Sequence, residues 1–342
     1  MFKGRFELYF RQVKILSVLN ILFVGSDDVA RSIAKKSDSR DVDNYIYKDL
    51  KEGGEFSTIS ILRPKNYPEK PKPFFASLTV SDFGIVEVNN VDAAFGESIV
   101  SMASAGIEEG FVIINPADGG WVDESQVKGL LTQAGLENWA FIENDGITIR
   151  EKLIDILNKI EPHDETGFVV AVDQAFTVKG VGLVAIGHVQ SGKLNKHSDV
   201  IFAGSEGSAV ARSLQVMDLD VDIAHVGDRV GLALRANGSF RDDLLGRGSI
   251  LADSTERFEI QKKSNFKLNK AAFQKHELVE GDVIHLCSDF QFVVGRITNV
   301  KDSIEVEWDS PIVINKTSKR NSLIIQLESK PRIMGSAKMN SA

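Results

Sequence analysis

Residues 24–32, VGSDDVARS, follow the apolar run ILSVLNILF and have part of the spacing of a phosphate-binding loop. Such a loop reads G-x-x-x-x-G-K-[ST] between a strand and a helix, so that backbone amides and a lysine surround the phosphates. Gly25 and Ser32 stand at the first and last of these positions, but Ala30 replaces the second glycine and Arg31 replaces the lysine. Taken alone, this spacing favours coincidence over a nucleotide site.

Other residue types that carry chemistry have no recognisable spacing. The six histidines do not form H-E-x-x-H or H-x-H, and the sequence contains no G-x-S-x-G. The single cysteine, Cys287, excludes an intrachain disulfide and fits a buried thiol in a reducing compartment. We therefore expect no metal and no catalytic residue.

Charge is unevenly distributed along the 342 residues, which carry a net charge of -8. Residues 260–342 hold 13 Lys and Arg against 9 Asp and Glu, so the rest of the chain is strongly acidic. A basic C-terminal third suggests a polyanionic partner, and an unevenly charged, solvated surface is the alternative. The apolar run at 13–24 is too short to span a membrane and lacks a small-x-small cleavage site, which predicts a buried strand, a cytoplasmic location and no membrane partner.

The chain divides into two kinds of pattern. From residue 15 to about 160, strand-like runs such as FFASLTV (74–80) and FGIVEV (83–88) alternate with helix-like stretches, which indicates a mainly parallel sheet with crossover helices. The acidic segment EPHDETG (161–167) marks a boundary, and short strands separated by turns follow it. The predicted order is an α/β domain followed by two all-β domains.

The second region carries the most specific patterns. AFTVKGVGLVAIGHVQSGKLNKHSDVIF is followed by SLQVMDLDVDIAHVGDRVGLALR and DDLLGRGSILAD. These stretches resemble the second domain of the translation GTPases related to elongation factor Tu, particularly the selenocysteine-specific branch, whose pattern includes F-[ST]-x-K-G-x-G and G-x-R-V-G-L. The third region resembles the family's third domain more loosely, and its closing PRIMG is similar to the R-I-[IVM]-G ending of the selenocysteine-type factors.

This resemblance implies a fold and its boundaries. We expect a degenerate P-loop-GTPase-like α/β domain at 1–162, then β-barrels at 163–256 and 257–335, and a frayed tail at 336–342. With this family context, the loop-like spacing at Gly25 becomes a vestigial phosphate site rather than a coincidence.

The other nucleotide motifs that the resemblance implies are eroded as well. The second switch, D-x-P-G-H, is aligned with VDAAFGES, where Asp92 and Gly96 are one residue too far apart and Glu97 lies near the position of the water-orienting histidine. The guanine-reading N-K-x-D is aligned with IEND, of which Asp145 remains. Thr58 is a weak counterpart of the magnesium-binding threonine, and an ordinary strand position is the preferred interpretation.

These losses together predict a silent enzyme. Phosphoryl transfer depends on positioning and charge, and the planar fork of an arginine does not replace the point charge of a lysine. We expect no appreciable GTP hydrolysis and no required cofactor, while weak binding of GTP or GDP with magnesium stays open. The vestigial nucleotide-binding positions are Gly25, Ala30, Arg31, Ser32, Asp92, Gly96 and Asp145.

The resemblance also implies that the second and third domains contact tRNA. His188 and Gln190 occupy the arginine and glutamate positions of the family's G-R-V-E-x-G turn, near the terminal adenosine, although a surface strand position is the preferred interpretation of His188. Arg229 lies in GDRVGL, where a structural ion pair is slightly favoured. The basic loop NKTSKRN suits sugar-phosphate contacts, with a solvated turn as the alternative. The RNA-binding candidates are Lys179, His188, Gln190, Arg212, Arg235, Lys316, Lys319 and Arg320.

Three hypotheses about function follow. The first is an elongation-factor-like protein that binds tRNA or another structured RNA without hydrolysing GTP, with the ribosome or a protein as further candidate partners. The second is a protein-interaction scaffold or regulator derived from a translation GTPase. The third is a GTP-binding elongation factor with unusual motifs.

Overall fold

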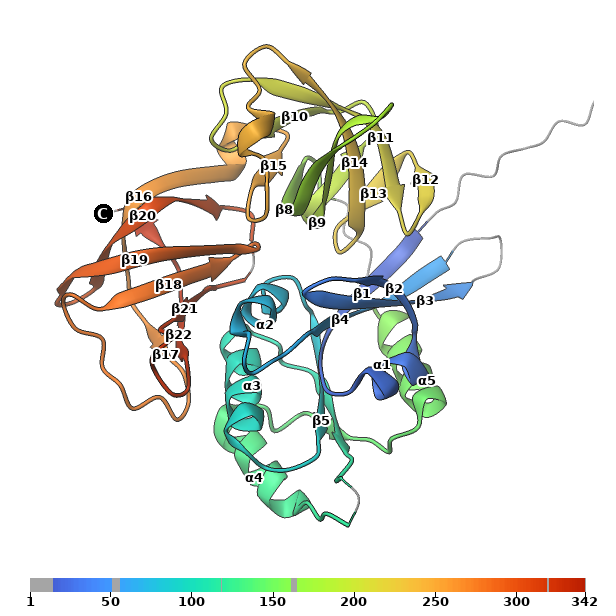
Figure 1. The fold of residues 1–342 in the computed structure, drawn as a ribbon, viewed down its shortest axis with the longest axis vertical. Helices are drawn as coiled ribbons and strands as arrows, with labels where there is room; N and C mark the ends of the chain where they lie inside the picture. Colours follow the sequence, from blue (N-terminus) through green and yellow to red (C-terminus); the bar gives the residue numbers. More distant parts are fainter. Residues whose placement is uncertain (1–14, 51–55, 118, 161–164, 319, 342) are drawn as a thin grey trace, which may run out of the picture.

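The computed structural model describes residues 15–50, 56–117, 119–160, 165–318 and 320–341. They form three sheets that correspond to three domains, with the first domain at the bottom of Figure 1, the second at the top and the third at the left. The α/β domain followed by two antiparallel β domains confirms the predicted fold class.

The first domain is built on a seven-stranded sheet in the order β2-β3-β4-β1-β5-β6-β7. Strands β1, β4, β5, β6 and β7 are parallel, whereas β2 and β3 form an antiparallel hairpin at one edge. The strands are β1 (Ile15–Val24), β2 (Lys35–Ser39), β3 (Val42–Leu50), β4 (Phe56–Pro64), β5 (Phe83–Val88), β6 (Gly110–Ile114) and β7 (Ala140–Phe141). The helices are α1 (Asp27–Ile33), α2 (Pro71–Leu78), α3 (Ala93–Ser104), α4 (Glu124–Ala134) and α5 (Gly146–Leu157).

The order of this sheet determines where a ligand site of the α/β type would lie. In open α/β sheets, ligands bind beyond the carboxyl ends of the strands, at the point where the strand order reverses. Here β1 lies between β4 on one side and β5 on the other, and it pairs in parallel with both. The residues that end β1, β4, β5 and β6 are therefore the ones that meet at such a site.

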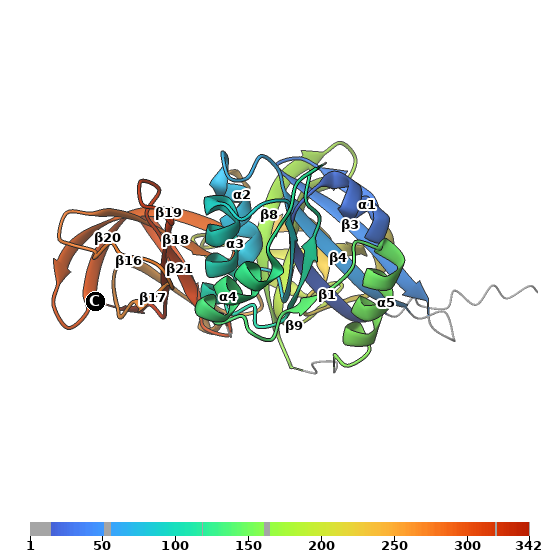
Figure 2. The same ribbon diagram turned by 90° about the horizontal axis from the view of Figure 1, so that it is seen from below.

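The segment FFASLTV is a helix, so the predicted strand at 74–80 is wrong. Its helix α2 begins at Pro71, where proline is favoured, and Phe74 and Phe75 are both fully buried. Helix α2 lies between β4 of its own domain and the third domain, as Figure 2 shows. Because both sides of the helix are covered, every residue from position 73 to 78 is buried, and this stretch lacks the one-sided pattern of a surface helix.

The second domain is an antiparallel barrel in which β10 pairs with both β15 and β11 and so closes the sheet. Its strands are β8 (Phe168–Val178), β9 (Gly182–Asn195), β10 (Asp199–Phe202), β11 (Ser208–Val216), β12 (Leu219–Val221), β13 (Ile223–His225), β14 (Arg229–Asn237) and β15 (Ile250–Ala252), with a short 3-10 helix at Asp242–Leu244.

The third domain is an eight-stranded antiparallel sheet, entered through a 3-10 helix at Thr255–Arg257. Its strands are β16 (Phe258–Phe266), β17 (Asn269–Lys270), β18 (Val283–Ser288), β19 (Gln291–Val300), β20 (Ile304–Asn315), β21 (Ser322–Ile325), β22 (Ile333–Ala337) and β23 (Asn340–Ser341). Because β22 runs to Ala337 and β23 pairs with β16, the segment predicted as a frayed tail belongs to this sheet.

Within the part of the chain that the structure describes, no helix is both long and apolar enough to cross a membrane.

Candidate functional site

Helix α1 begins two residues after Gly25, too early for a phosphate-binding loop. Ser26 caps the helix by accepting a hydrogen bond from the Val29 amide (3.3 Å). The positions expected to lie in or just after the loop are in the body of the helix instead: Ala30 is fully buried, and the Ser32 hydroxyl donates to the Val29 carbonyl (2.7 Å). Arg31 is turned back on Asp27 in an ion pair. These residues therefore form no phosphate cradle.

The amide at the start of this helix is bound by a carboxylate of the chain itself. Glu87, near the end of β5, accepts a hydrogen bond from the Ser26 amide (2.5 Å) and another from the Asn115 side chain (2.5 Å). A Cβ added to Gly25 would lie 2.7 Å from Glu87, so glycine is required there by this close approach. Glu87 is buried, and it fills the place where an anion would meet the end of β1. Sequence reasoning missed this residue because no expected motif contains it.

An ion-pair cluster fills the adjacent space. Lys36 lies 2.8 Å from Asp27 and 2.9 Å from Asp43, and Arg63 contacts Asp43 at 3.0 Å while donating to the Gly25 carbonyl at 2.7 Å. Hydrogen bonds from Lys36, Tyr45 and Arg31 hold the pKa of Asp27 far below its usual value. The basic side chains nearest to Gly25 are thus already paired with aspartates.

Two of the remaining motif residues cap helices. Asp92 accepts from the Phe95 amide (2.8 Å) at the start of α3, and Gly96 lies within that helix. Asp145 accepts from the amide (2.8 Å) and hydroxyl (2.6 Å) of Thr148 at the start of α5, and these bonds lower its pKa. The capping roles account for both aspartates without a nucleotide.

Thr58 lies in β4, fully buried, with its hydroxyl 3.3 Å from the Met217 sulfur. It is an ordinary strand residue at the contact between the first and second domains.

A second N-x-x-D spacing was overlooked in the sequence. Residues 115–118 read NPAD directly after β6, with proline where the motif has lysine. The Asn115 side chain donates a hydrogen bond to Glu87 at the carboxyl edge of the sheet. Asp145, by contrast, follows the edge strand β7. Because β6 lies beside β5, the residues that follow it are placed close to the end of β5, and this would have favoured NPAD over IEND. Asp118 lies outside the described residues.

Three RNA-binding candidates of the second domain are close together. Lys179 is exposed in the turn between β8 and β9, and Arg212 donates to the Val181 carbonyl (2.7 Å) in the same turn. Arg235 is exposed on β14, one residue beyond Leu234, which pairs with Leu183 of that hairpin. The neighbouring side chains of Phe176 and Val181 are also exposed. This end of the barrel, defined by Lys179, Arg212 and Arg235, is called the basic tip below.

His188 is buried, so its preferred interpretation as a surface strand residue is wrong. Only 2% of it is exposed, because the third domain packs on β9 and places Phe290 5.4 Å from the imidazole ring. Burial, and secondarily the charges of Arg229 and Arg320, lower its pKa to about 3. His188 and the half-buried Gln190 line a cavity between the three domains rather than an open face of the second.

The basic loop of the third domain is only partly free. Lys316 is exposed, but Arg320 forms an ion pair with Asp82 and donates to the Ser81 carbonyl, which ties the loop to the first domain. Arg320 is therefore a domain contact rather than an open phosphate site. Lys319 lies outside the described residues.

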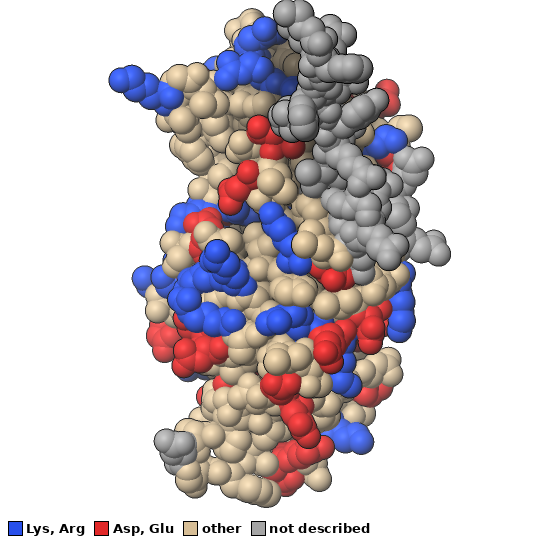
Figure 3. Space-filling model, turned by 90° about the vertical axis from the view of Figure 1, so that its right-hand side faces the viewer, with Lys and Arg blue, Asp and Glu red and all other residues tan. Residues whose placement is uncertain are grey.

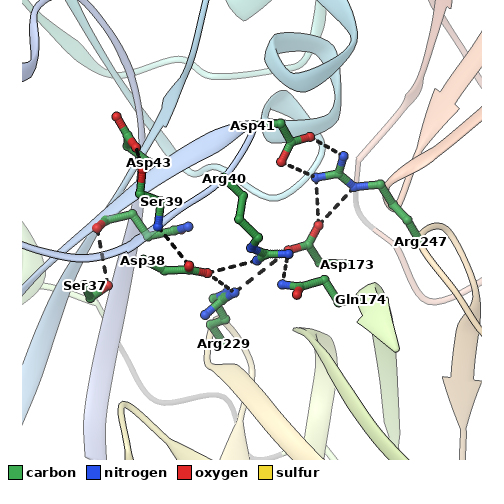
Figure 4. A network of polar contacts seen from close by, with 11 residues as sticks. Ser37, Asp38, Ser39, Arg40, Asp41, Asp43, Asp173, Gln174, Arg229 and Arg247 are labelled. Atoms are coloured by element: carbon green, nitrogen blue, oxygen red, sulfur yellow. Dashed lines mark hydrogen bonds and ion pairs between the residues drawn. The ribbon is translucent and has the colours of Figure 1, made fainter. Parts of the chain in front are cut away.

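A second set of ion pairs joins the β2–β3 hairpin to the barrel. Arg229 contacts Asp38 at 3.1 Å, which confirms the structural ion pair expected for it. Arg247 lies 2.8 Å from Asp173 and also pairs with Asp41, and Figure 4 shows Asp173 between three arginines. These ion pairs thus help to hold the hairpin to the second domain.

Glu97 has a structural role of the same kind. Its carboxylate accepts from the guanidinium (3.0 and 3.1 Å) and the amide (2.8 Å) of Arg332, and from the hydroxyl of Tyr67 (3.0 Å). Arg332 belongs to the PRIMG segment, so this pair fastens α3 to the third domain. Among the described residues, no group of three or more His, Cys, Asp or Glu side chains is arranged to hold a metal ion.

Comparison with solved structures finds the same fold in known proteins. Translation elongation factor SelB from Methanococcus maripaludis, solved with the GTP analogue GppNHp, matches 97% of this chain and 80% of its own with a TM-score of 0.76 and 17% identity. A bacterial selenocysteine-specific elongation factor matches 95% of this chain, but 58% of its own, with a TM-score of 0.76.

Sequence comparison also finds elongation factors among the relatives of this chain. An uncharacterized protein of Methanocaldococcus jannaschii is 28% identical over 320 residues, covering 93% of this chain and 98% of its own. The selenocysteine-specific elongation factor of Escherichia coli is 28% identical over 217 residues, but only about a third of its length (34%) is matched. Elongation factor 1-alpha of Halobacterium salinarum is 26% identical over 181 residues. No family model matches the sequence. The chain thus has the fold of the SelB elongation factors, and part of its sequence is similar to selenocysteine-specific elongation factors and to elongation factor 1-alpha.

Proposed function

We propose that this protein is an elongation-factor-like protein that binds tRNA or another structured RNA and does not hydrolyse GTP. The hydrogen bond from the Ser26 amide to Glu87 is the observation that supports the lack of GTP hydrolysis. A phosphate needs that amide as a donor and a positive charge beside it. A buried carboxylate in the same place removes the donor and adds repulsion.

Nearby basic groups do not restore such a site. Lys36 is held between Asp27 and Asp43, and the Arg63 guanidinium is bound to Asp43 and the Gly25 carbonyl. Freeing either cation would take one of its two basic partners from the buried Asp43 carboxylate, which is costly. A nucleotide would therefore have to displace the Glu87 carboxylate and break the ion pairs that Lys36 and Arg63 form with the aspartates.

The basic tip supports RNA binding. Lys179, Arg212 and Arg235 are exposed from three different strands or turns of one barrel end, and the exposed Phe176 offers an aromatic face beside them. Cations that position a sugar-phosphate backbone next to an aromatic ring suit structured RNA with an accessible base. Over the middle of the face shown in Figure 3, lysines and arginines are mixed with acidic side chains. We therefore assign RNA contact to the barrel end.

Filter binding of bulk tRNA at low and moderate salt tests this proposal. The variant Lys179→Gln/Arg212→Gln/Arg235→Gln should bind tRNA at least tenfold more weakly, and the slope of log affinity against log salt should fall by about two to three. The matched control, Lys267→Gln/Lys301→Gln/Lys338→Gln, removes the same charge from exposed positions of the third domain and should bind like the parent protein.

The outcomes separate the three hypotheses. Absence of salt-sensitive tRNA affinity, together with a co-purified protein partner, would replace RNA binding with the scaffold function. Equal losses in the two triple variants would mean that the basic tip is not the contact. Turnover of GTP by the purified protein would overturn the non-hydrolysing part.

A further inference from the structure

A pocket of about 550 Å³ lies within the third domain, along β16, β17, β22 and β23. All of its lining residues belong to this domain, so the pocket is separate from the carboxyl edge of the first sheet and from the basic tip. Its volume falls in the range of about 300–1,000 Å³ that is typical of small-molecule sites.

The strand pairing is interrupted at this pocket. Asn269 of β17 pairs with Ser336 of β22, and the pairing of β16 with β23 continues the same antiparallel register. Between these two paired stretches, β16 has ended before β17 begins, and β22 has ended before β23 begins. The register places Lys267 opposite Lys338 in this gap, and both residues line the pocket. Like charges directly opposite each other on paired strands are destabilising.

The protein itself does not neutralise these two lysines. Among the described residues, no ion pair or side-chain hydrogen bond joins Lys267 or Lys338 to a partner, and both are exposed. The neighbouring Lys270, by contrast, pairs with Glu277. Asp302 also lines the pocket, but within the described part of the chain it forms an ion pair with neither lysine. Two positive charges therefore line the gap without a bound counter-charge.

The other polar side chains of the pocket are uncharged. They are four carboxamides and two hydroxyls, namely Asn265, Asn269, Asn321, Asn340, Ser303 and Ser336. Carboxamides and hydroxyls both donate and accept hydrogen bonds, which suits a ligand that carries several hydroxyl groups. Asp302 adds a pure acceptor at the turn between β19 and β20, where it favours a hydroxyl donor and repels a second anionic group.

We propose that this pocket binds a free phosphomonoester of a sugar or polyol. The phosphate lies between the ammonium groups of Lys267 and Lys338, whose two charges match a phosphomonoester charge of about −1.5 to −2 near pH 7. The hydroxyl groups of the ligand bond the carboxamides and Asp302. A carboxylate or an RNA phosphodiester carries a single charge and would leave one lysine without a counter-charge.

This proposal goes beyond RNA binding and does not depend on it, because the basic tip belongs to the second domain. A phosphate bound to both Lys267 and Lys338 would remove their repulsion and join the two sides of the gap. Ligand binding should therefore stabilise the folded third domain.

The test is calorimetric titration of the full chain with glycerol 3-phosphate, ribose 5-phosphate and glucose 6-phosphate. Glucose and inorganic phosphate serve as reference probes. We expect at least one ester to give saturable heat, to raise the thermal unfolding midpoint and to bind at least tenfold more tightly than either reference probe. Absence of heat and of a shift with all three esters would overturn the proposal. Binding of inorganic phosphate as tight as that of every ester would overturn it as well.

Lys267→Gln/Lys338→Gln should weaken ester binding tenfold or more, because both charged donors are lost. Without ligand this variant should be at least as stable as the parent protein, since the repulsion across the gap is gone. Loss of binding is then not a consequence of unfolding. The matched control, Lys275→Gln/Lys330→Gln, removes two exposed lysines of the same domain that do not line the pocket, and it should bind the ester like the parent protein. Unchanged ester binding by Lys267→Gln/Lys338→Gln would contradict the proposal.

Asp302→Asn tests the recognition of the hydroxyl groups. It should bind inorganic phosphate no more weakly than the parent protein, and it should reduce the preference for the ester by about threefold or more. An unchanged preference would contradict the contact between Asp302 and the ligand. Lys267→Gln/Lys338→Gln should also keep the tRNA affinity of the parent protein. If it lost tRNA affinity while the parent protein bound no ester, the two lysines would belong to an RNA surface and the proposal would be wrong.

Discussion

At the scale of single residues, the proposed loss of phosphate binding rests on Glu87. It bonds the Ser26 amide and the Asn115 side chain while lying against Gly25. Glu87→Ala should lower the free energy of unfolding by about 2–3 kcal/mol, because it leaves a buried amide unpaired. Glu87→Gln should cost less than about 1 kcal/mol, since Asn115 can present its oxygen to the new amide.

Urea denaturation of the two variants measures the difference. If Glu87→Ala and Glu87→Gln lowered the free energy of unfolding equally, the hydrogen bonds of the Glu87 side chain would not contribute to the stability of this edge of the sheet.

A second residue, Asp228, ties stability to pH. It is fully buried, one oxygen accepts from the His225 amide, and the other has no partner among the described residues. Burial raises the pKa of Asp228 from 3.8 to about 7. The folded state therefore holds this proton more tightly than the unfolded state, and the free energy of unfolding should fall as pH rises from about 4 to about 7.

Asp228→Asn should remove that part of the pH dependence, which amounts to at most about 4 kcal/mol. Chemical denaturation across this range compares the variant with the parent protein. Asp222→Asn, at an exposed position, is the control and should keep the parent slope. An unchanged slope in Asp228→Asn would show that Asp228 ionises normally in the folded protein.

Single residues were also where sequence reasoning was least accurate. The resemblance of AFTVKGVGLVAIGHVQSGKLNKHSDVIF to a known domain indicated the barrel. Nothing in a lone strand reveals that the third domain buries His188 or that Asp82 pairs with Arg320. Contacts between domains depend on their relative placement. A sequence pattern within one domain contains no information about that placement.

At the scale of elements, a buried ion pair helps to attach helix α3 to the third domain. Side-chain exposure is 7% for Glu97 and 18% for Arg332. Glu97→Ala should destabilise the protein by about 3–5 kcal/mol, because an unpaired arginine is left in a largely buried place. Glu97→Leu/Arg332→Leu should be less destabilising than Glu97→Ala, since no charge remains.

The exposed pair Lys263–Glu307 provides the comparison: Glu307→Ala should change stability by less than about 1 kcal/mol. Thermal or urea unfolding gives all three values. If Glu97→Leu/Arg332→Leu were less stable than Glu97→Ala, this expectation would be wrong. The ion pair would then stabilise the protein by more than an unpaired Arg332 destabilises it.

The elements that could be predicted are those with a one-sided or repeated pattern. The buried strands β1 and β5 and the helix α5 appear in the sequence because their environments lie within one domain. Helix α2 was mistaken for a strand because two domains cover it. The N-x-x-D after β6 needed the strand order before it could be given weight.

At the scale of the whole molecule, the three domains are joined by contacts that involve no ligand. Asp173 links two arginines of the second domain with the β2–β3 hairpin, and Arg332 and Arg320 link the third domain to the first. A ligand changes a conformational equilibrium only by binding one state better than another. Since we propose that the phosphate site is filled by Glu87, small-angle scattering profiles with and without GTP should superimpose.

The central claim is that the chain's own carboxylate has replaced the phosphate at the end of β1. The most direct test is calorimetric titration of the purified protein with GTP, GDP and a non-hydrolysable analogue in the presence of magnesium. We predict no binding heat at millimolar nucleotide. Micromolar or tighter binding would contradict the account, because it would require Glu87 to leave Ser26 and the segment VGSDDVARS to hold phosphate after all.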